Sequence, residues 1–222
     1  MRVIERNKKG RKYYYIQHSF RKGGKIITRE RYLGKIIPEN VEKIMQDMKK
    51  ESEKDLYANL EKIRKNFQKE WKGLPESAKE REKEEIAIAF TYNTNAIEGS
   101  AITLGETREI IHDKTAPKKP LRDIKETEAH SKVFFDMLNS KEKISASLML
   151  KWHKDVFGET KPDIAGKSRT YLVRVGDYIA SDWQDIGAVM KELVRFIRSS
   201  DANAVELAAR VHYRFEKIHP FG

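Results

Sequence analysis

Apolar residues recur at helical spacing through most of the chain, and this periodicity limits the possible folds more than any other feature. It begins after Pro38 and continues to Ile218, with interruptions at glycine and proline residues. Side chains three or four positions apart lie on one face of an α-helix, so each segment predicts an amphipathic helix. Residues 171–179 instead alternate with a period of two, which is typical of a strand. We therefore expect a mainly α-helical fold with one strand-like hairpin.

Helix ends are indicated by capping residues. Thr103 and Glu106 have the spacing of a capping box, and so do Ser181 and Gln184. The last helix is expected to stop at His219, because the residue that follows is a proline. The imidazole then stands at a corner between the helix and a loop. Taken alone, it predicts no more than a group that caps the final carbonyls of the helix.

Nearly all of the net charge lies in residues 1–38. They contain 12 Lys and Arg residues but only Glu5 and Glu30 as acids, and so carry +10 of the formal charge of +11. The aromatic side chains interleaved with these bases include Tyr13, Tyr14, Tyr15 and Phe20. This combination suits contact with a nucleic-acid backbone and stacking on bases. A solvated basic hairpin, or one that binds an acidic protein partner, explains the same composition.

Strand-like composition is the second property of this basic segment. Residues 13–16 and 25–33 are rich in β-branched and aromatic side chains, and Gly23-Gly24 between them predicts a tight turn. The resulting hairpin or small meander is expected to end at Gly34. The chain then divides into three parts: a basic β-rich module (residues 1–38), a charged helical connector (39–75) and a helical domain (76–222).

Several classes of protein are excluded by what the sequence lacks. It has no cysteine, which excludes disulfides, thiolate metal sites and cysteine nucleophiles, and favours a reducing compartment. No apolar run approaches the roughly 18 residues that a membrane span needs, and the first residues do not resemble a signal peptide. The six histidines form no recognised metal-ligand spacing, and no phosphate-binding glycine loop occurs. We expect a cytoplasmic protein with no membrane partner and no metal site.

Three motifs together resemble those of one family. Residues 218–222, Ile-His-Pro-Phe-Gly, are similar to the start of the Fic (Fido) signature, His-Pro-Phe-x-Asp/Glu-Gly-Asn-Gly-Arg-x-x-Arg. Residues 94–99, Thr-Asn-Ala-Ile-Glu-Gly, resemble the inhibitory-helix motif of the family, Ser/Thr-x-x-x-Glu-Gly/Asn. Residues 166–193 resemble its flap hairpin and the helix that follows. The resemblance covers residues 76–222 in the order of the family.

The resemblance implies a Fic-type helical bundle with a β-hairpin flap, and a protein adenylyltransferase that uses ATP and Mg²⁺. Such an enzyme moves AMP from ATP to a Ser, Thr or Tyr hydroxyl of a protein. His219 would be the general base that takes the proton from this hydroxyl, at a pKa suited to neutral pH. The carboxylate of Glu98, within the motif bounded by Thr94 and Gly99, would obstruct ATP. The alternative interpretation is that Glu98 is simply an acid at the end of a helix, facing solvent or a core amide.

The flap would bind the target as an added β-strand. The residues that would offer this edge are Leu172, Val173, Arg174 and Val175. An ordinary surface hairpin would show the same alternation of residues.

The resemblance stops inside the signature. After His219 the sequence supplies Pro220, Phe221 and Gly222, and does not include the acid for Mg²⁺, the Gly-Asn-Gly phosphate cradle or either arginine. One of those arginines would be the partner of Glu98. We therefore expect this truncated chain to bind neither ATP nor Mg²⁺ productively and to be inactive, whether it is a natural truncation or a fragment. The alternative function is that of a non-catalytic remnant that binds protein or nucleic acid.

Overall fold

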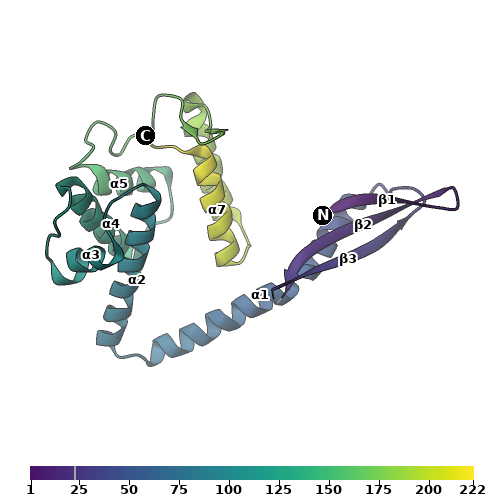
Figure 1. Cartoon of the computed structure of the whole chain (residues 1–222), viewed down its shortest axis with the longest axis horizontal. Coiled ribbons are helices and arrows are strands. Elements are labelled where there is room, and N and C mark those ends of the chain that lie inside the picture. The colour runs from purple at the N-terminus through teal and green to yellow at the C-terminus, as the bar shows by residue number, and fades with distance from the viewer. Residues whose placement is uncertain (23) are drawn as a thin grey trace. The chain divides into compact units, whose positions relative to one another are not determined.

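The computed structural model describes residues 1–22 and 24–222, which form two compact units, Met1–Lys72 and Gly73–Gly222 (Figure 1). None of the helices in these residues combines the length and the apolar composition that a bilayer crossing requires. The division of the chain into three functional parts stays a prediction.

The first unit begins with an antiparallel meander. Strands β1 (Arg2–Lys8), β2 (Arg11–Lys22) and β3 (Lys25–Gly34) are hydrogen-bonded in that order. The meander ends at Gly34, as the sequence predicts, but strand β1 was not predicted. Lys9 and Gly10 join β1 to β2 with positive φ angles of 52° and 74°, which suit a two-residue hairpin turn. Of the predicted Gly23-Gly24 turn, Gly23 lies outside the described residues.

One long helix, α1 (Val41–Gly73), packs on one face of this sheet. Ile16 of β2 and Met48 of α1 are both buried. The His18 imidazole Nε2 and the Ser52 hydroxyl are 2.9 Å apart and share a hydrogen bond. Because side chains alternate along a strand, the side chains of Tyr13 and Tyr15 lie on the opposite face of the sheet from Ile16 and His18.

The second unit is built mainly of helices. These are α2 (Glu76–Ile97), α3 (Leu104–Arg108), the π-helical turn η1 (Glu109–Asp113), α4 (Leu121–Asn139), α5 (Ala146–Phe157), the 3₁₀ turn η2 (Trp183–Asp185), α6 (Ile186–Ser199) and α7 (Ala204–Ile218). Between α5 and η2 lies a short hairpin, β4 (Arg174–Val175) and β5 (Tyr178–Ile179). The mainly helical fold class with a small N-terminal strand module is confirmed.

The core under the C-terminal helix is formed by α6 and α7. Its fully packed members are Ile186, Met190, Leu193 and Ile218. Phe215 and Val211 of α7 pack against this cluster, together with Met149 of α5. Burial of these apolar side chains fixes the last turns of α7 against the rest of the unit.

The predicted helix starts are confirmed in one place and wrong in another. Thr103 forms both hydrogen bonds of the predicted capping box with Glu106. At residues 181–184, however, the Asp182 side chain accepts from the Gln184 amide and starts η2, so Ser181 is not the cap. The strand-like stretch 171–179 is also shorter than its alternation suggests, because it pairs only through β4 and β5.

Candidate functional site

His219 closes helix α7 in a conformation that few non-glycine residues adopt. Its φ and ψ angles are 46° and 65°, in the left-handed region, and its amide donates to the Phe215 carbonyl at 2.8 Å. The Pro220 that follows is buried. The chain therefore turns sharply at the histidine, as the His-Pro sequence predicts. Such a turn leaves the last carbonyls of the helix without partners in the helix itself.

Arg169 supplies partners for the carbonyls at the corner where α7 ends. Its guanidinium donates to the carbonyls of His219 at 2.7 Å (from Nε) and Ile218 at 3.2 Å (from Nη2). Its backbone amide also donates to the Pro220 carbonyl at 2.9 Å. The side chain is 4% exposed. A cation at this position also suits the negative end of the α7 dipole.

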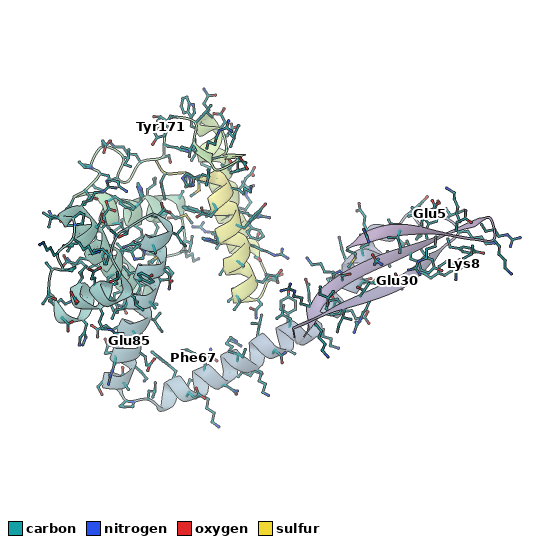
Figure 2. All side chains as sticks on the ribbon, viewed as in Figure 1. Glu5, Lys8, Glu30, Phe67, Glu85 and Tyr171 are labelled. Carbon is teal, nitrogen blue, oxygen red and sulfur yellow. The ribbon has the colours of Figure 1, made fainter. Side chains whose placement is uncertain are left out.

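The same guanidinium holds both ends of the flap segment. Nη1 of Arg169 donates to the Tyr171 carbonyl at 2.5 Å, and Nη2 donates to the Ser181 carbonyl at 2.5 Å. Tyr171, labelled in Figure 2, lies at the start of the segment that leads into β4. One buried side chain thus connects the histidine corner to the two ends of the hairpin.

A second set of contacts joins the flap to α7 at Lys217. The Tyr178 hydroxyl donates to the Lys217 carbonyl at 2.5 Å, and the Ser181 amide donates to it at 3.4 Å. The Lys217 ammonium lies 3.5 Å from the centre of the Tyr178 ring, in a cation–π contact. Together with the Arg169 contacts, these satisfy the carbonyls of three successive residues at the end of the helix.

Phe221 is packed from two sides. Its ring stacks on His153 at a centroid distance of 4.0 Å and an interplanar angle of 13°, and meets the Phe215 ring edge-on. The Gly166 amide donates to Nδ1 of His153 at 3.0 Å, which fixes the neutral imidazole. Burial lowers the pKa of His153, and the charge of Lys161 lowers it further. The Phe of the His-Pro-Phe sequence is therefore a packing residue at this corner.

The flap itself is a tight hairpin with a two-residue turn. Arg174 pairs with Ile179 and Val175 with Tyr178, and the turn has Gly176 at φ 58°. The Ala180 amide also donates to the Val173 carbonyl at 3.0 Å. Leu172 is 64% exposed, Val175 is 46% exposed and Arg174 is also exposed. Of the predicted flap residues, Arg174 and Val175 form the exposed strand β4, and Leu172 and the half-buried Val173 lead into it.

The segment 94–99 forms the end of α2. The Glu98 amide donates to the Thr94 carbonyl at 3.4 Å, and Gly99 ends the helix with φ 81°. Glu98 is exposed, and within the described residues its carboxylate has no hydrogen-bond or ion-pair partner. No hydrogen bond or ion pair in residues 1–22 and 24–222 joins this segment to His219. The structure thus brings the flap and the His-Pro-Phe residues together, but forms no such bond from Glu98 to them.

Gly222 lies against the flap segment. A Cβ built on this residue would collide with the Tyr171 hydroxyl. The two predicted motifs, residues 219–222 and the flap, are therefore in contact through Tyr171 and Arg169.

A hollow of the surface lies elsewhere in the second unit. It has a volume of about 550 Å³ and is lined by Glu80, Arg81, Glu84, Glu85, Arg108, His112 and Phe135. Arg108 pairs with Glu85, His112 with Glu84 and Glu80 with Lys83, so most of its charged groups already have partners. None of the predicted site residues lines it.

The donor set for a metal ion is incomplete in the described part of the chain. It contains no group of three or more His, Asp or Glu side chains that could hold an ion. The described residues therefore supply no preformed Mg²⁺ site on their own.

Arg169 and Tyr178 were missed as site residues by sequence reasoning. The Gly-Lys-Ser-Arg sequence that ends at Arg169 resembles part of the family pattern, but a single arginine gives no sign that it is buried. The side chains of both residues donate to backbone carbonyls. Because every residue carries a carbonyl, no particular residue type in the sequence indicates these partners.

Comparison with known proteins agrees with this arrangement. Residues 143–222 match the model of the Fic/DOC family. The chain is 31% identical over 145 residues to the protein adenylyltransferase Fic of Nematostella vectensis, an alignment that covers 62% of this chain and 34% of that protein. It is 31% identical over 146 residues to the protein adenylyltransferase fic-1 of Caenorhabditis elegans, covering 62% and 29%. The chain thus spans about a third of the length of these relatives.

Solved structures show the same fold. A structure of Fic-1 from C. elegans matches with a TM-score of 0.64 at 25% identity, covering 83% of this chain and 57% of that one. A Fic domain containing signaling protein from Bacteroides thetaiotaomicron matches with a TM-score of 0.59 at 23% identity, covering 71% and 65%. The second unit has the helical fold of a Fic domain. The chain is a Fic domain protein.

Proposed function

We propose that this chain forms the core of a protein adenylyltransferase, which transfers AMP from ATP to a Ser, Thr or Tyr hydroxyl of a protein. The observation that carries the proposal is the hydrogen bonding of Arg169, which joins the His219 corner to both ends of the flap. The names of the two relatives above support the same activity. A non-catalytic remnant has no comparable support.

His219 is proposed as the general base. In this role its imidazole takes the proton from the target hydroxyl while the hydroxyl oxygen attacks the α-phosphorus of ATP and pyrophosphate leaves. The fixed backbone of His219 supports this role, because its amide and carbonyl are both held at 2.7–2.8 Å. A base contributes most when its position is set before the reaction.

The flap is proposed as the docking edge for the target. In an antiparallel hairpin, the backbone groups of alternate residues point to the same edge. The carbonyl of Val173 accepts from the amide of Ala180, directly after β5, so the backbone groups of Leu172 and Arg174 face the free edge. An extended target segment would pair there as an added strand, with Val173 and Val175 completing the docking strand.

Glu98, with Thr94 and Gly99, is proposed as the inhibitory element. In the complete protein its carboxylate would pair with an arginine of the signature and so obstruct ATP, which requires the carboxylate to be accessible. The exposed position of Glu98 at the end of α2 supports this role.

ATP and Mg²⁺ are proposed as the co-substrate and the metal of the complete active site. When bound, Mg²⁺ would stabilise the charge that develops on the phosphates. The acid, the Gly-Asn-Gly cradle and the arginines that serve this purpose in the family have no counterpart in the 222 residues. The proposal is therefore that His219 and the flap supply the base and the target edge, and that transfer needs the rest of the signature.

Residues 1–38 are proposed to bind a polyanionic partner. Their charge of +10 suits a nucleic acid or an acidic protein.

The test of transferase activity compares the 222-residue chain with a version extended by the rest of the signature and the following helix of a relative. Both are incubated with a lysate and with ATP labelled on either the α- or the γ-phosphate. The extended protein should transfer the α-label and not the γ-label, and the unextended chain should transfer neither. Transfer of the γ-label would mean phosphorylation, and absence of any transfer by the extended protein would contradict the proposal.

A further inference from the structure

The open face of the N-terminal sheet combines aromatic rings with positive charge. This open face is the one opposite Ile16, His18 and helix α1, and strand pairing assigns residues to it: Tyr15 pairs with Tyr32 and Arg6 with Tyr13. The basic side chains that share the face are Arg2, Arg6, Lys8, Arg11 and Arg21. Among the described residues, the one acid on this face is Glu30, labelled in Figure 2.

The three tyrosines of the open face form a contiguous cluster. The ring of Tyr32 lies 5.2 Å from that of Tyr15 and 6.2 Å from that of Tyr13, both tilted. Tyr32 is 53% exposed, whereas Tyr13 and Tyr15 are half-buried. Tyr32 therefore has a ring surface free for stacking, and the other two rings support it from the side.

Polar contacts hold two basic side chains of the face, Arg6 and Arg2, in place. The Arg6 guanidinium lies 5.1 Å from the centre of the Tyr15 ring and donates to the Glu30 carboxylate at 2.6 Å. Gln17 donates to the same Glu30 oxygen at 3.0 Å and accepts from Arg2 at 2.8 Å. The single acid is thus shared between Arg6 and Gln17. The remaining bases leave the face strongly positive.

We propose that the open face binds single-stranded nucleic acid, with Tyr32 stacking on a base and the arginines and Lys8 contacting phosphates. Planar rings and a positive surface on one antiparallel sheet are the two features that sequence-tolerant single-strand binding requires. Duplex nucleic acid keeps its bases stacked inside and offers none to Tyr32. The proposal deepens the polyanionic partner proposed for residues 1–38 and does not depend on adenylyl transfer.

The test measures binding of the full chain to labelled oligonucleotides of about 20 nucleotides, longer than the roughly 4–16 that one small module covers. Fluorescence anisotropy is followed from about 50 to 200 mM salt. The four probes are single-stranded oligothymidylate DNA, single-stranded oligouridylate RNA, a duplex and a polyglutamate peptide. Single strands should bind more tightly than the duplex and the peptide. Arg11→Gln with Arg21→Gln should lower the salt slope by about 1.4, or 0.7 for each lost phosphate contact. Lys65→Gln with Lys132→Gln, both highly exposed and far along the sequence, should leave it unchanged.

The aromatic part is tested with substitutions that separate stacking from folding. Tyr32→Leu keeps an apolar side chain and should weaken single-strand binding about 5- to 140-fold, whereas Tyr32→Phe keeps the ring and should bind like the original chain. Tyr213→Leu, an exposed tyrosine of α7, serves as the matched control. Equal binding by the Tyr32→Leu and Tyr32→Phe variants would overturn the proposal. If the chain binds polyglutamate as tightly as single strands, the nucleic-acid proposal is also overturned, but the polyanionic partner proposed for residues 1–38 is still supported. If it binds none of the probes, both proposals are contradicted.

Discussion

Replacing Arg169 with alanine tests whether one side chain connects the histidine corner to the flap. The substitution removes four hydrogen bonds from the guanidinium, to the carbonyls of His219, Ile218, Tyr171 and Ser181. A hydrogen bond to a charged group contributes about 1.5–3 kcal/mol, but water entering the vacated space would satisfy part of the exposed carbonyls. We therefore expect the free energy of unfolding to fall by about 3–5 kcal/mol, the range for breaking a buried charged contact.

Two further variants separate the geometry of the guanidinium from its charge. Arg169→Lys keeps the charge but offers donors from one nitrogen, which cannot reach four carbonyls spread around a planar fork. It should lose about 1–3 kcal/mol. The matched control is Arg198→Ala, because Arg198 also donates to a carbonyl, that of Ile144 at 2.9 Å, but is exposed. This variant should lose less than about 1 kcal/mol.

Urea unfolding followed by far-UV circular dichroism measures these differences, and amide hydrogen exchange locates them. The amide of Ser181, bonded to Lys217, should exchange faster in Arg169→Ala and not in Arg198→Ala. If Arg169→Ala is as stable as Arg198→Ala and the Ser181 amide stays protected, the reasoning about this site is refuted.

Three other variants test separate parts of the account. Burial lowers the folded-state pKa of His153, so the unfolded chain binds more protons below about pH 6.5 and stability should fall as the pH drops. Urea titrations at several pH values should show a weaker fall for His153→Gln than for the original chain. Gly176 has a φ of 58°, so Gly176→Val should destabilise the flap hairpin by about 1–2 kcal/mol, measured by hydrogen exchange of the Tyr178 amide. The control Gly187→Ala, in helix α6, should not destabilise the hairpin. Glu98→Gly in the extended protein should raise the initial rate of AMP transfer and Glu142→Gly should not; equal rates would contradict the inhibitory role.

The predictions that held depend on local chemistry. The Thr103 capping box and the end of the last helix at His219 each need only a few neighbouring residues. The same reasoning misplaced the next capping residue, since Asp182 competes with Ser181 one position away and both types of side chain accept hydrogen bonds well. Local sequence signals thus predict that a helix is present more reliably than they predict the residue at which it begins.

The site contacts depend on residues distant in sequence, which local patterns do not report. Arg169 meets residues about fifty positions later, and its acceptors are backbone carbonyls. Strand β1 was missed for a related reason: its charged sequence forms a strand because β2 supplies the hydrogen bonds along its edge. The family resemblance located His219 and the flap, but the structure was needed to find what joins them.

The role of His219 as the base for AMP transfer is the central claim, and the rate of α-label transfer by the extended protein tests it most directly. His219→Ala should lower the initial rate by about 10²- to 10⁴-fold, the usual contribution of a positioned general base. His212→Ala, an exposed histidine two turns earlier on α7, should leave the rate within about twofold of the original, since surface substitutions of this kind rarely alter a fold. Equal rates for the two variants would contradict the account.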